Sequence, residues 1–589
     1  MPTLIHRLHE WSKEAPHEPA QAKMEKGGWK MISSKEYFDQ IFYLTLYLET
    51  KGFNESDTLA VLSYNRPEST YCEFAPHLLR GMSVGLYPSA SDKDISFILS
   101  NTESRFIGIQ NSSYFPKIKD IDQFETILVF EGETDFSEKA ISFQDALTIG
   151  KSLAQKKSAQ EYLDRLDPKR RSFLIYTSGT TGFPKGAMLS HHNFIFAGDA
   201  ATKAFNIPHR DNGRFISFLP LCHVAEKMQA LAVGISSRYT VYFTSKFEAV
   251  SKEMPLVKPT AMLSVPRLWE KMMEGIQKKI AAEPGTKGKV LRKIFELNQI
   301  SAEREFKKDG SYGLSNLLIQ KVSKELFVKK ALEKLGIDEL KCAGSGAAAL
   351  PAHVARFFRS FGIEILEDFG QTETTGVTCM TVPGEDCAGT VGLPIENTDF
   401  KIADDGEILT RGDHVFLGYL KNDTATQETI DQDGWLHTGD LGKYNEKGYV
   451  QIVGRKKEIM KSSGGKMVAP VPIEELIKQS SLVSQACMVG DGKKFFSALI
   501  TLEASVLNRI KHSSDAIEGV IVKSKEILTE LEKTLAEVNQ KLARYEQIKQ
   551  FRVLSRDFLL EEDEVTPTLK MKRHVISKNF EQVIESMYE

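Results

Sequence analysis

The chain has 589 residues, more than one ordinary hydrophobic core can hold, so we expect at least two domains. Hydrophobic residues make up 41% of the chain and charged residues 26%, and the formal net charge is -3. These values indicate a globular protein and argue against a nucleic-acid-binding protein or a disordered chain. The six cysteines are scattered without a CxxC pair, which is typical of free thiols in a reducing compartment and not of a structural zinc site.

Neither the beginning of the sequence nor its apolar runs predict insertion into a membrane. The N-terminal segment MPTLIHRLHEWSKEAP carries charges throughout, unlike a signal peptide, and no apolar run approaches the ~18 residues of a membrane span. We therefore expect a cytoplasmic protein, and peripheral contact with the inner face of the membrane stays open.

Short β-type runs recur through the first two thirds of the chain, with helical patterns between many of them. They are Leu59–Tyr64, Arg105–Ile109, Thr126–Phe130, Phe173–Tyr176, Phe215–Phe218, Thr240–Phe243, Ala261–Val265 and Ile363–Glu367. Such alternation predicts an α/β architecture with largely parallel sheets.

The pattern changes over residues 276–335, which form a long, mainly helical and Lys-rich stretch broken by turn residues. Lys and Arg outnumber Asp and Glu there. The segment either lies on an anionic membrane surface or is simply a solvated helical face.

The Gly-rich and charged stretch 438–465 is the best candidate for a domain boundary. Beyond it, strands are predicted at Gln485–Val489 and Phe495–Leu502, followed by a helix whose apolar positions step by three and four residues. Those positions are Leu531, Leu535, Val538, Leu542 and Tyr545. The chain is thus predicted to end in a small α+β domain.

The segment YTSGTTGFPKGAML, Tyr176–Leu189, follows a predicted strand and has the composition of an anion-binding loop. Glycines allow backbone N–H groups to approach one anion, hydroxyl groups add donors, and Lys185 adds positive charge. The segment is not a Walker A loop: counted from Gly179, Pro184 stands where the second Gly belongs, and Gly186 where the magnesium-binding Ser or Thr belongs. A P-loop NTPase is therefore disfavoured.

YTSGTTGFPKG resembles the phosphate-binding signature of the adenylate-forming superfamily, which comprises acyl-CoA synthetases, luciferases and the adenylation domains of peptide synthetases. Other segments resemble the remaining motifs in family order: LPLCHVAEK, AGSGAAALP, EDFGQTETTG, GWLHTGDLG, GRKKEIMK and TPTLKMKR. The resemblance begins at NRPES (Asn65–Ser69) and covers nearly the whole chain.

This resemblance implies an α/β fold with a large N-terminal adenylate-forming domain over residues 1–454, with mostly parallel sheets and a distorted barrel. The helical insertion would be residues 276–335. A small mobile α+β C-terminal domain would cover residues 455–589, with a hinge near 455–457 and Lys457 at the pivot.

The resemblance also implies an ATP- and AMP-binding set. Its members are Thr177, Ser178, Gly179, Thr180, Thr181, Lys185, Gly346, Ala347, Asp368, Phe369, Gly370, Gln371, Thr372, Asp440, Arg455 and Lys461. Glu373 and Thr180 would bind Mg²⁺, an ion that accepts one or two protein oxygens together with phosphate oxygens. Phe369 would lie beside adenine in place of a more usual Tyr, and Asp440 would accept hydrogen bonds from the ribose.

The catalytic residues implied by the resemblance are Lys570, Glu373, Thr372 and His223. Lys570 would stabilise negative charge on the carboxylate and α-phosphate as they react. His223 would lie between the acyl and phosphate sites, and Ser463 and Gly464 would line the channel for the pantetheine arm of CoA. Without the resemblance, the histidine would be interpreted as a core residue and the two lysine-rich motifs as solvated surface.

The implied reaction is the ATP-dependent activation of a long-chain fatty acid to acyl-AMP, followed by transfer to CoA. VPRLWEKM (Val265–Met272), the helical segment after it and the TPTLK form of the last motif favour the long-chain branch. Two alternatives stay open: a fatty acyl-AMP ligase that hands the acyl group to a carrier protein, and a non-catalytic lipid- or nucleotide-binding relative. The sequence does not decide the fatty-acid chain length or the oligomeric state.

Overall fold

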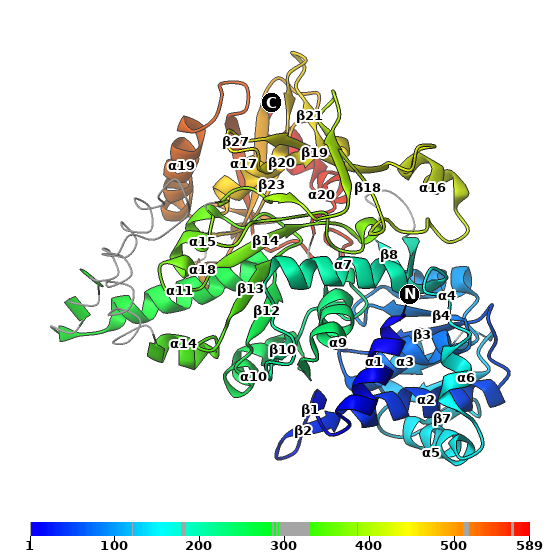
Figure 1. Ribbon diagram of the computed structural model, residues 1–589. Helices are drawn as coiled ribbons and strands as arrows, with labels where there is room; N and C mark the ends of the chain where they lie inside the picture. Colours follow the sequence, from blue (N-terminus) through cyan, green and yellow to red (C-terminus); the bar gives the residue numbers. More distant parts are fainter. Residues whose placement is uncertain are drawn as a thin grey trace.

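Figure 1 shows the computed structural model, in which roughly the first three quarters of the chain form a broad base and the rest lies on top of it. The structure describes residues 2–119, 122–177, 184–244, 246–285, 288–289, 292–293, 329–385, 387–510, 517–566 and 570–589. Most of the predicted helical segment 276–335 lies outside the described residues, as do Ser178, Gly179, Thr180 and Thr181.

A seven-stranded sheet forms the first layer, in the order β7-β6-β5-β3-β4-β8-β9. All neighbours are parallel except β8 and β9, which form an antiparallel hairpin. The strands are β3 (Thr58–Leu62), β4 (Met82–Leu86), β5 (Phe106–Ile109), β6 (Thr126–Val129), β7 (Ala140–Ser142), β8 (Arg171–Thr177) and β9 (Lys185–Ser190). Helices cover this sheet: α2 (Ser34–Thr50), α3 (Pro67–Leu78), α4 (Asp92–Thr102), α5 (Phe143–Ala154) and α6 (Ala159–Leu163).

A nine-stranded sheet forms the second layer, in the order β16-β15-β14-β13-β12-β10-β11-β1-β2. Its central strands run parallel, and β2, β15 and β16 are antiparallel to their neighbours. The strands are β1 (Pro19–Glu25), β2 (Gly28–Ser33), β10 (Arg214–Ser217), β11 (Thr240–Phe243), β12 (Ala261–Ser264), β13 (Cys342–Ser345), β14 (Ile365–Phe369), β15 (Cys379–Met380) and β16 (Leu393–Pro394).

Helices from this part of the chain fill the space around and between the two sheets. They are α1 (Leu4–Glu14), α7 (His191–Ala204), α8 (Val224–Lys227), the π-helix η2 (Met228–Val233), α9 (Gly234–Ser237), α10 (Val250–Val257), α11 (Pro266–Ala282), α14 (Lys329–Leu335) and α15 (Ala352–Arg359). A capping box explains why α7 starts directly after β9: the Asn193 N–H donates to Ser190 Oγ, and the Ser190 N–H donates to Asn193 Oδ1. One hydrophobic core, which includes Leu128, Phe173 and Phe194, extends over both layers.

A buried ion pair joins two of these helices. Lys227, at the end of α8, is fully buried against Glu73 of α3, and Ser83 Oγ donates a hydrogen bond to the same carboxylate at 2.7 Å. Buried charges need such partners, because an unpaired ion loses its hydration without compensation.

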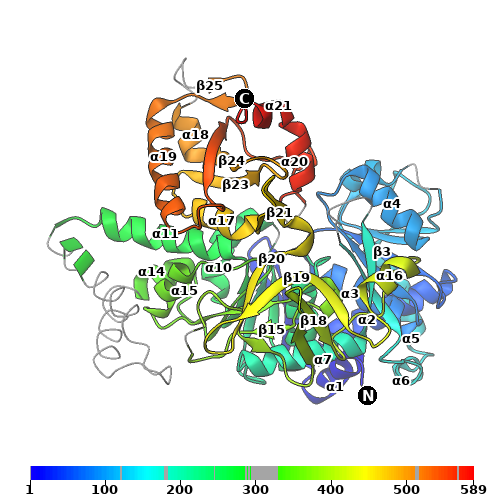
Figure 2. The ribbon, with the colours of Figure 1, turned by 90° about the horizontal axis from the view of Figure 1, so that it is seen from above.

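A four-stranded antiparallel sheet follows, in the order β17-β18-β19-β20, with α16 (Asp423–Thr429) between β18 and β19. Its strands are β17 (Asp399–Ile402), β18 (Glu407–Arg411), β19 (Leu436–Tyr444) and β20 (Val450–Arg455). It connects the base of the molecule to the upper part, which is yellow to red in Figures 1 and 2.

The last part of the chain has its own α+β core. A five-stranded sheet in the order β23-β24-β27-β26-β25 stands beside the small hairpin β21 (Met460–Lys461) and β22 (Met467–Val468). The sheet strands are β23 (Val483–Val489), β24 (Phe496–Leu502), β25 (Ile517–Glu518), β26 (Ile521–Val522) and β27 (Ile548–Leu554). The helices are α17 (Pro470–Ile477), α18 (Ala504–Ile510), α19 (Lys525–Gln540), α20 (Arg573–Asn579) and α21 (Glu581–Glu585), and two apolar clusters here include only residues from Met460 onward.

The predicted helix with apolar residues from Leu531 to Tyr545 is too long. The structure ends α19 at Gln540, because Asn539 turns its side chain to the backbone of Ile548, accepting from its N–H and donating to its carbonyl, each at 2.9 Å. Leu542 and Tyr545 therefore lie beyond the helix, and Tyr545 is about half exposed.

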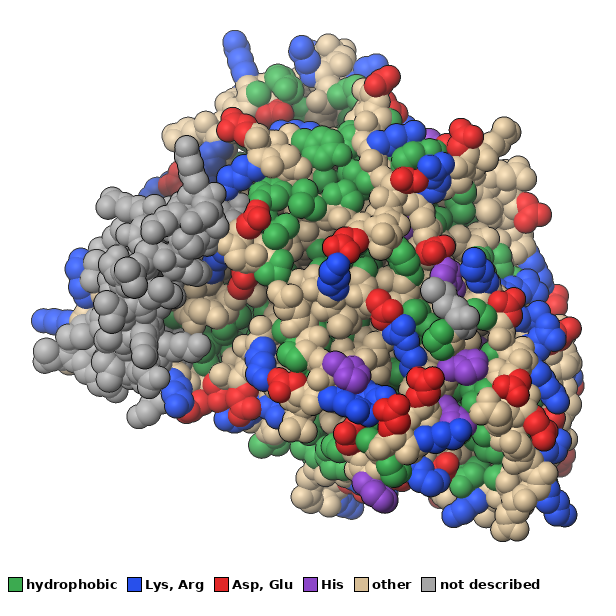
Figure 3. All heavy atoms as spheres, in the orientation of Figure 1, with side chains coloured by type: hydrophobic (Ala, Val, Ile, Leu, Met, Phe, Trp, Pro, Cys, Tyr) green, Lys and Arg blue, Asp and Glu red, His purple; other side chains and the backbone are tan. Residues whose placement is uncertain are grey.

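Three features of the described residues concern the cysteines, the helices and the surface. All six cysteines are buried free thiols, as predicted. Among the described helices, none is both long enough and apolar enough to span a membrane. On the face shown in Figure 3, acidic and basic side chains are interspersed over the base of the molecule.

Candidate active site

The segment after β14 forms a tight turn that carries four of the predicted site residues, Gly370, Gln371, Thr372 and Glu373. A Cβ built on Gly370 would lie 2.4 Å from the backbone carbon of Gly376, so the close return of the chain requires glycine here. The turn is closed by hydrogen bonds from the Gln371 N–H to Thr374 Oγ1 at 3.0 Å and from the Gly376 N–H to the Gln371 carbonyl at 2.9 Å. It carries Thr372 and Glu373 on a short 3₁₀ helix.

Glu373 is buried and is held by a residue that the sequence did not single out. Tyr419 Oη donates a hydrogen bond of 2.6 Å to Glu373 Oε1, and the Phe416 N–H donates to the Glu373 carbonyl at 2.9 Å. Burial, together with the negative charge of Glu373, raises the pKa of Tyr419, so its hydroxyl stays protonated and keeps donating. One oxygen of Glu373 is thereby fixed, and the carboxylate retains capacity for another ligand.

The same tyrosine contacts the lysine of the phosphate-loop motif. Lys185 Nζ lies 5.1 Å from the centroid of the Tyr419 ring, within the range of a cation–π interaction. The contact forms because the segment with Tyr419 pairs with β9: the Leu420 N–H donates to the Gly186 carbonyl, and the Met188 N–H donates to the Gly418 carbonyl. No local sequence pattern predicts this role of Tyr419, since Glu373 and Lys185 are 46 and more residues away along the chain.

The loop itself is described only at its two ends. Thr177 ends β8 and is the register partner of Lys185, the first residue of β9. The predicted contributions of Ser178, Gly179, Thr180 and Thr181 stay predictions, because these residues lie outside the described part of the chain.

Asp440 and Arg455 face each other across β19 and β20. They are register partners in the sheet, and Arg455 Nε lies 3.1 Å from Asp440 Oδ1. Asp440 is 5% exposed, and burial raises its pKa although the positive charges of Arg455 and Lys570 oppose that effect. The predicted ribose residues are therefore adjacent and oriented by the strands that carry them.

Lys570 reaches this group from the other end of the chain. A turn holds it, in which its N–H donates to Thr566 Oγ1 at 3.0 Å and its carbonyl accepts from the Thr566 N–H at 2.8 Å. Part of the side chain touches solvent, yet loss of hydration around the ammonium lowers the pKa of Lys570, as does the charge of Arg455. The negative charges of Asp440 and Glu373 act on the pKa of Lys570 in the opposite direction, so Lys570 interacts electrostatically with both carboxylates.

His223 completes the cluster. It precedes α8, where its Nδ1 accepts a hydrogen bond of 3.3 Å from the Ala225 N–H. Burial and the positive charge of Lys570 lower the pKa of His223 to about 4, so the imidazole is neutral near pH 7. With Nδ1 acting as acceptor, the ring proton is assigned to Nε2, which leaves a donor for another group.

The predicted purine-binding residues lie together beside β14. A Cβ built on Gly346 would lie 2.5 Å from Asp368 Oδ1, so the turn after β13 presses its backbone against that carboxyl group. Ala347 adopts a φ of 68°, which marks the sharp turn. Asp368 Oδ1 is buried without a hydrogen-bond partner among the described residues, and burial raises the pKa of Asp368 to about 7.

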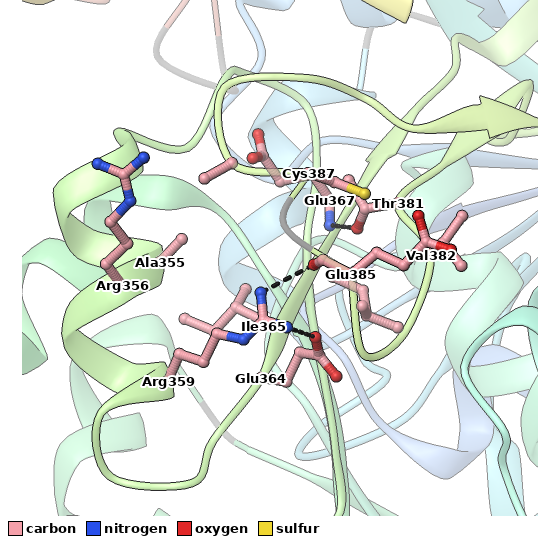
Figure 4. Close-up of a pocket in the computed structure, with 12 residues that line it drawn as sticks. Ala355, Arg356, Arg359, Glu364, Ile365, Glu367, Thr381, Val382, Glu385 and Cys387 are labelled. Atoms are coloured by element: carbon pink, nitrogen blue, oxygen red, sulfur yellow. Dashed lines mark hydrogen bonds and ion pairs between the residues drawn. The ribbon is translucent and has the colours of Figure 1, made fainter. Parts of the chain in front are cut away.

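A separate small cavity lies next to this segment, lined by α15, β14 and the loop 381–388 (Figure 4). The carboxyl group of Glu367, in its wall, accepts from the Leu350 N–H at 2.9 Å, and burial raises the pKa of Glu367 to about 8. The cavity measures about 30 Å³, room for about one water molecule. Its size excludes it as the nucleotide site.

The predicted hinge and CoA residues lie in the upper part of the molecule. Lys457 is exposed on a 3₁₀ turn after β20, and Lys461 is exposed on β21. Ser463 and Gly464 are exposed in the turn of the β21–β22 hairpin, where the Ser463 N–H donates to the Lys493 carbonyl at 2.8 Å. No hydrogen bond or ion pair within the described residues joins Lys461, Ser463 or Gly464 to Glu373, Asp440 or Lys570.

Comparisons with known proteins identify the family to which the chain belongs. The profile of the AMP-binding enzyme family matches residues 8–420, and that of the AMP-binding enzyme C-terminal domain matches residues 457–589. The long-chain-fatty-acid–CoA ligase FadD15 of Mycobacterium bovis is 31% identical over 587 residues, which cover 99% of this chain and 96% of the relative. The human long-chain-fatty-acid–CoA ligase ACSBG2 is 29% identical over 611 residues, covering 97% and 90% of the two chains.

Two solved structures have the same fold. The o-succinylbenzoate CoA synthetase MenE from Bacillus subtilis, in complex with ATP and a magnesium ion, has a TM-score of 0.68 and 20% identity, covering 96% of this chain and 98% of that one. The anthranilate–CoA ligase AuaEII in complex with anthranoyl-AMP has a TM-score of 0.72 and 17% identity, covering 98% and 97%. Together with the family profiles, which match more than half of the sequence, they show that this chain belongs to the family of AMP-binding, adenylate-forming enzymes.

Proposed function

We propose that the protein is an AMP-forming long-chain fatty acid–CoA ligase. The observation that carries the proposal is the site geometry, with Asp440 paired to Arg455 and Glu373 held by Tyr419, together with the electrostatic interaction of Lys570, from the end of the chain, with His223, Glu373 and Asp440. The full-length relatives named long-chain-fatty-acid–CoA ligases support the choice of substrate.

In the first step a carboxylate oxygen of the fatty acid attacks the α-phosphorus of ATP. A new O–P bond forms as the bond to the β-phosphate oxygen breaks, and pyrophosphate leaves. Asp440 and Arg455 would position the ribose, and Thr177 and Lys185 the pyrophosphoryl end. Lys570 would stabilise the negative charge that concentrates where carboxylate and phosphate meet, and His223 Nε2–H would donate to one of those oxygens.

In the second step the sulfur of CoA attacks the acyl carbon. A C–S bond forms, the bond between the acyl carbon and the phosphate oxygen breaks, and AMP leaves. Both steps proceed without a covalent bond to the protein.

The site fits a magnesium ion that arrives with ATP. Among the described residues no group of three metal-ligating side chains exists, so the ion would take most of its ligands from phosphates and water. Glu373 is the residue that would hold it, since Tyr419 fixes one of its oxygens and leaves the other. When bound, magnesium would neutralise charge on the phosphates; Thr180, the second predicted ligand, lies outside the described residues.

We further propose that residues 1–454 and 455–589 act as two bodies hinged at Lys457. Lys570 would be inserted for the first step and withdrawn for the second, when the hairpin with Lys461, Ser463 and Gly464 would turn toward the site and admit the pantetheine arm. The separate apolar cores of the two parts support independent movement.

The proposal is tested with a panel of acids from acetate to oleate, with and without CoA, while acyl-AMP, AMP and thioester are followed. Pyrophosphate release that depends on a long-chain acid, with thioester formed only when CoA is added, is expected. Acyl-AMP that accumulates regardless of CoA would indicate the carrier-protein ligase instead. The absence of pyrophosphate release with every acid would indicate a binding protein.

Peripheral membrane contact through the basic segment 276–335 is a further part of the proposal. A flotation assay with vesicles containing anionic lipids, compared with neutral vesicles, tests it: electrostatic attachment predicts binding to anionic vesicles alone, lost at high salt.

A further inference from the structure

An ion pair far from the hinge joins the two parts of the molecule. Arg267 lies in the first turn of α11, which begins with Pro266 at its first position directly after β12. Its guanidinium group contacts the carboxylate of Glu503, which follows β24 in the upper part. Figure 2 shows α11 along the lower edge of that part.

The position of this contact distinguishes it from the other ion pairs between the two parts. Arg455 and Lys456 also pair with Asp440, Asp405 and Glu407, but they are hinge residues that stay near these partners by chain connection. Within the described residues, Arg267–Glu503 is the ion pair that links residues before 455 to residues after 457. This ion pair therefore forms only when the upper part lies against α11 as in this structure, with Lys570 in the site.

The charges around the pair are unbalanced. Arg267 also lies 3.3 Å from Glu270 on its own helix and interacts electrostatically with Glu274. Glu274 has Lys278 as its own ion-pair partner at 3.6 Å, so Glu270 and Glu503 are the two carboxylates that form ion pairs with Arg267. Without Arg267, Glu503 would face the carboxylate of Glu270, and attraction between the parts would become repulsion.

We propose that Arg267 and Glu503 form a latch that stabilises the arrangement in which Lys570 is inserted, and that the latch must open before CoA reacts. The inference rests on the proposed two-step function and deepens it. Arg267 and Glu503 are positioning residues: they act on the reaction through the placement of Lys570.

The latch has a limited strength, which suits a contact that breaks in each cycle. The side chains of Arg267 and Glu503 are 40% and 27% exposed. An ion pair with this exposure shifts the equilibrium between the inserted and withdrawn arrangements by about two- to five-fold, and it weakens as the salt concentration rises.

The test measures the two half-reactions separately in Arg267→Gln, Glu503→Gln and the double variant. Acyl-AMP formation should fall about two- to five-fold in Glu503→Gln and further in Arg267→Gln, where repulsion replaces attraction. Thioester formation from supplied acyl-AMP should stay unchanged or rise. In the double variant the combined loss should be smaller than the product of the two single losses.

Two controls separate the latch from general damage. Glu270→Gln removes a carboxylate that touches the same arginine within α11, and it should leave acyl-AMP formation unchanged. The exchanged pair Arg267→Glu/Glu503→Arg should restore acyl-AMP formation toward the wild-type rate. The difference in the rate of acyl-AMP formation between each single variant and the wild type should also shrink at high salt.

The inference is overturned if the wild type releases pyrophosphate and the single variants match it in both half-reactions, or if they lose both equally. A wild type that releases no pyrophosphate with any fatty acid contradicts the proposed function itself, so the two failures are distinguishable.

Discussion

Tyr419 is the residue that links the proposed magnesium ligand to the phosphate-loop lysine. Its hydroxyl holds Glu373, and its ring lies under the ammonium group of Lys185. Motif comparison identified both partners and missed the tyrosine, because its role depends on a contact between segments that only folding brings together.

Replacing Tyr419 with Phe removes this hydrogen bond and keeps the ring. Hydrogen bonds to charged groups contribute about 1.5–3 kcal/mol, so we expect Mg–ATP binding to weaken about tenfold or more. Calorimetric titration with ATP, with and without magnesium, measures the effect. Binding of ATP alone should change little, and Tyr444→Phe, at an exposed tyrosine, is the matched control. An equal loss without magnesium would contradict the assignment of Glu373.

The lowered pKa of Lys570 predicts a pH dependence. The ammonium form stabilises developing negative charge, and raising the pH removes it, so acyl-AMP formation should decline at a pH below the ordinary lysine value of about 10.4. Thioester formation from supplied acyl-AMP should lack this decline. Rate profiles of both half-reactions test it, and Lys570→Arg, which stays charged, should remove the alkaline limb.

At the scale of elements, the motif EDFGQTETTG was assigned site residues by resemblance, and the structure shows why its glycine is needed: the chain folds back on itself within six residues. Gly370→Ala would place a Cβ 2.4 Å from the Gly376 backbone, which must move and carry Thr372 and Glu373 with it. We expect acyl-AMP formation to fall at least about tenfold, since small displacements of positioning groups are costly. Gly275→Ala, in open space on α11, should be neutral or slightly stabilising.

Assays of acyl-AMP formation and of the melting temperature together check this prediction. A Gly370→Ala enzyme with wild-type activity would show that the turn relaxes without moving Glu373.

At the scale of the whole molecule, Lys570 comes from the upper part, which has its own apolar cores. Lys570→Ala should abolish most acyl-AMP formation and still allow thioester synthesis from supplied acyl-AMP, because only the first step needs the inserted lysine. Separate assays of the two half-reactions decide this. Equal loss in both would contradict the proposed role; Lys572→Ala, two residues on, is the control.

Much of the fold follows from local pattern. The predicted runs Thr240–Phe243, Phe173–Tyr176 and Thr126–Phe130 coincide with or overlap β11, β8 and β6, because β-branched and aromatic residues between turn signals favour strands. The strand β13 was indicated by the resemblance of AGSGAAALP and not by its composition: it consists of CAGS, whose small residues carry little strand signal, and it is placed by pairing with β12 and β14. The end of α19 was missed because the backbone of Ile548, the first residue of the next strand along the chain, binds the Asn539 side chain.

The sequence by itself determined the superfamily and the order of its motifs, and it supplied the candidate site residues Glu373, Asp440 and Lys570, because each motif is a local string of residues. Only the tertiary structure decided which side chains meet: Tyr419 with Glu373 and Lys185, and Arg267 with Glu503. Those contacts join segments 46 to 236 residues apart. These contacts form because of the way the sheets and domains pack. The residues around any one position do not show which distant segment will pack against it.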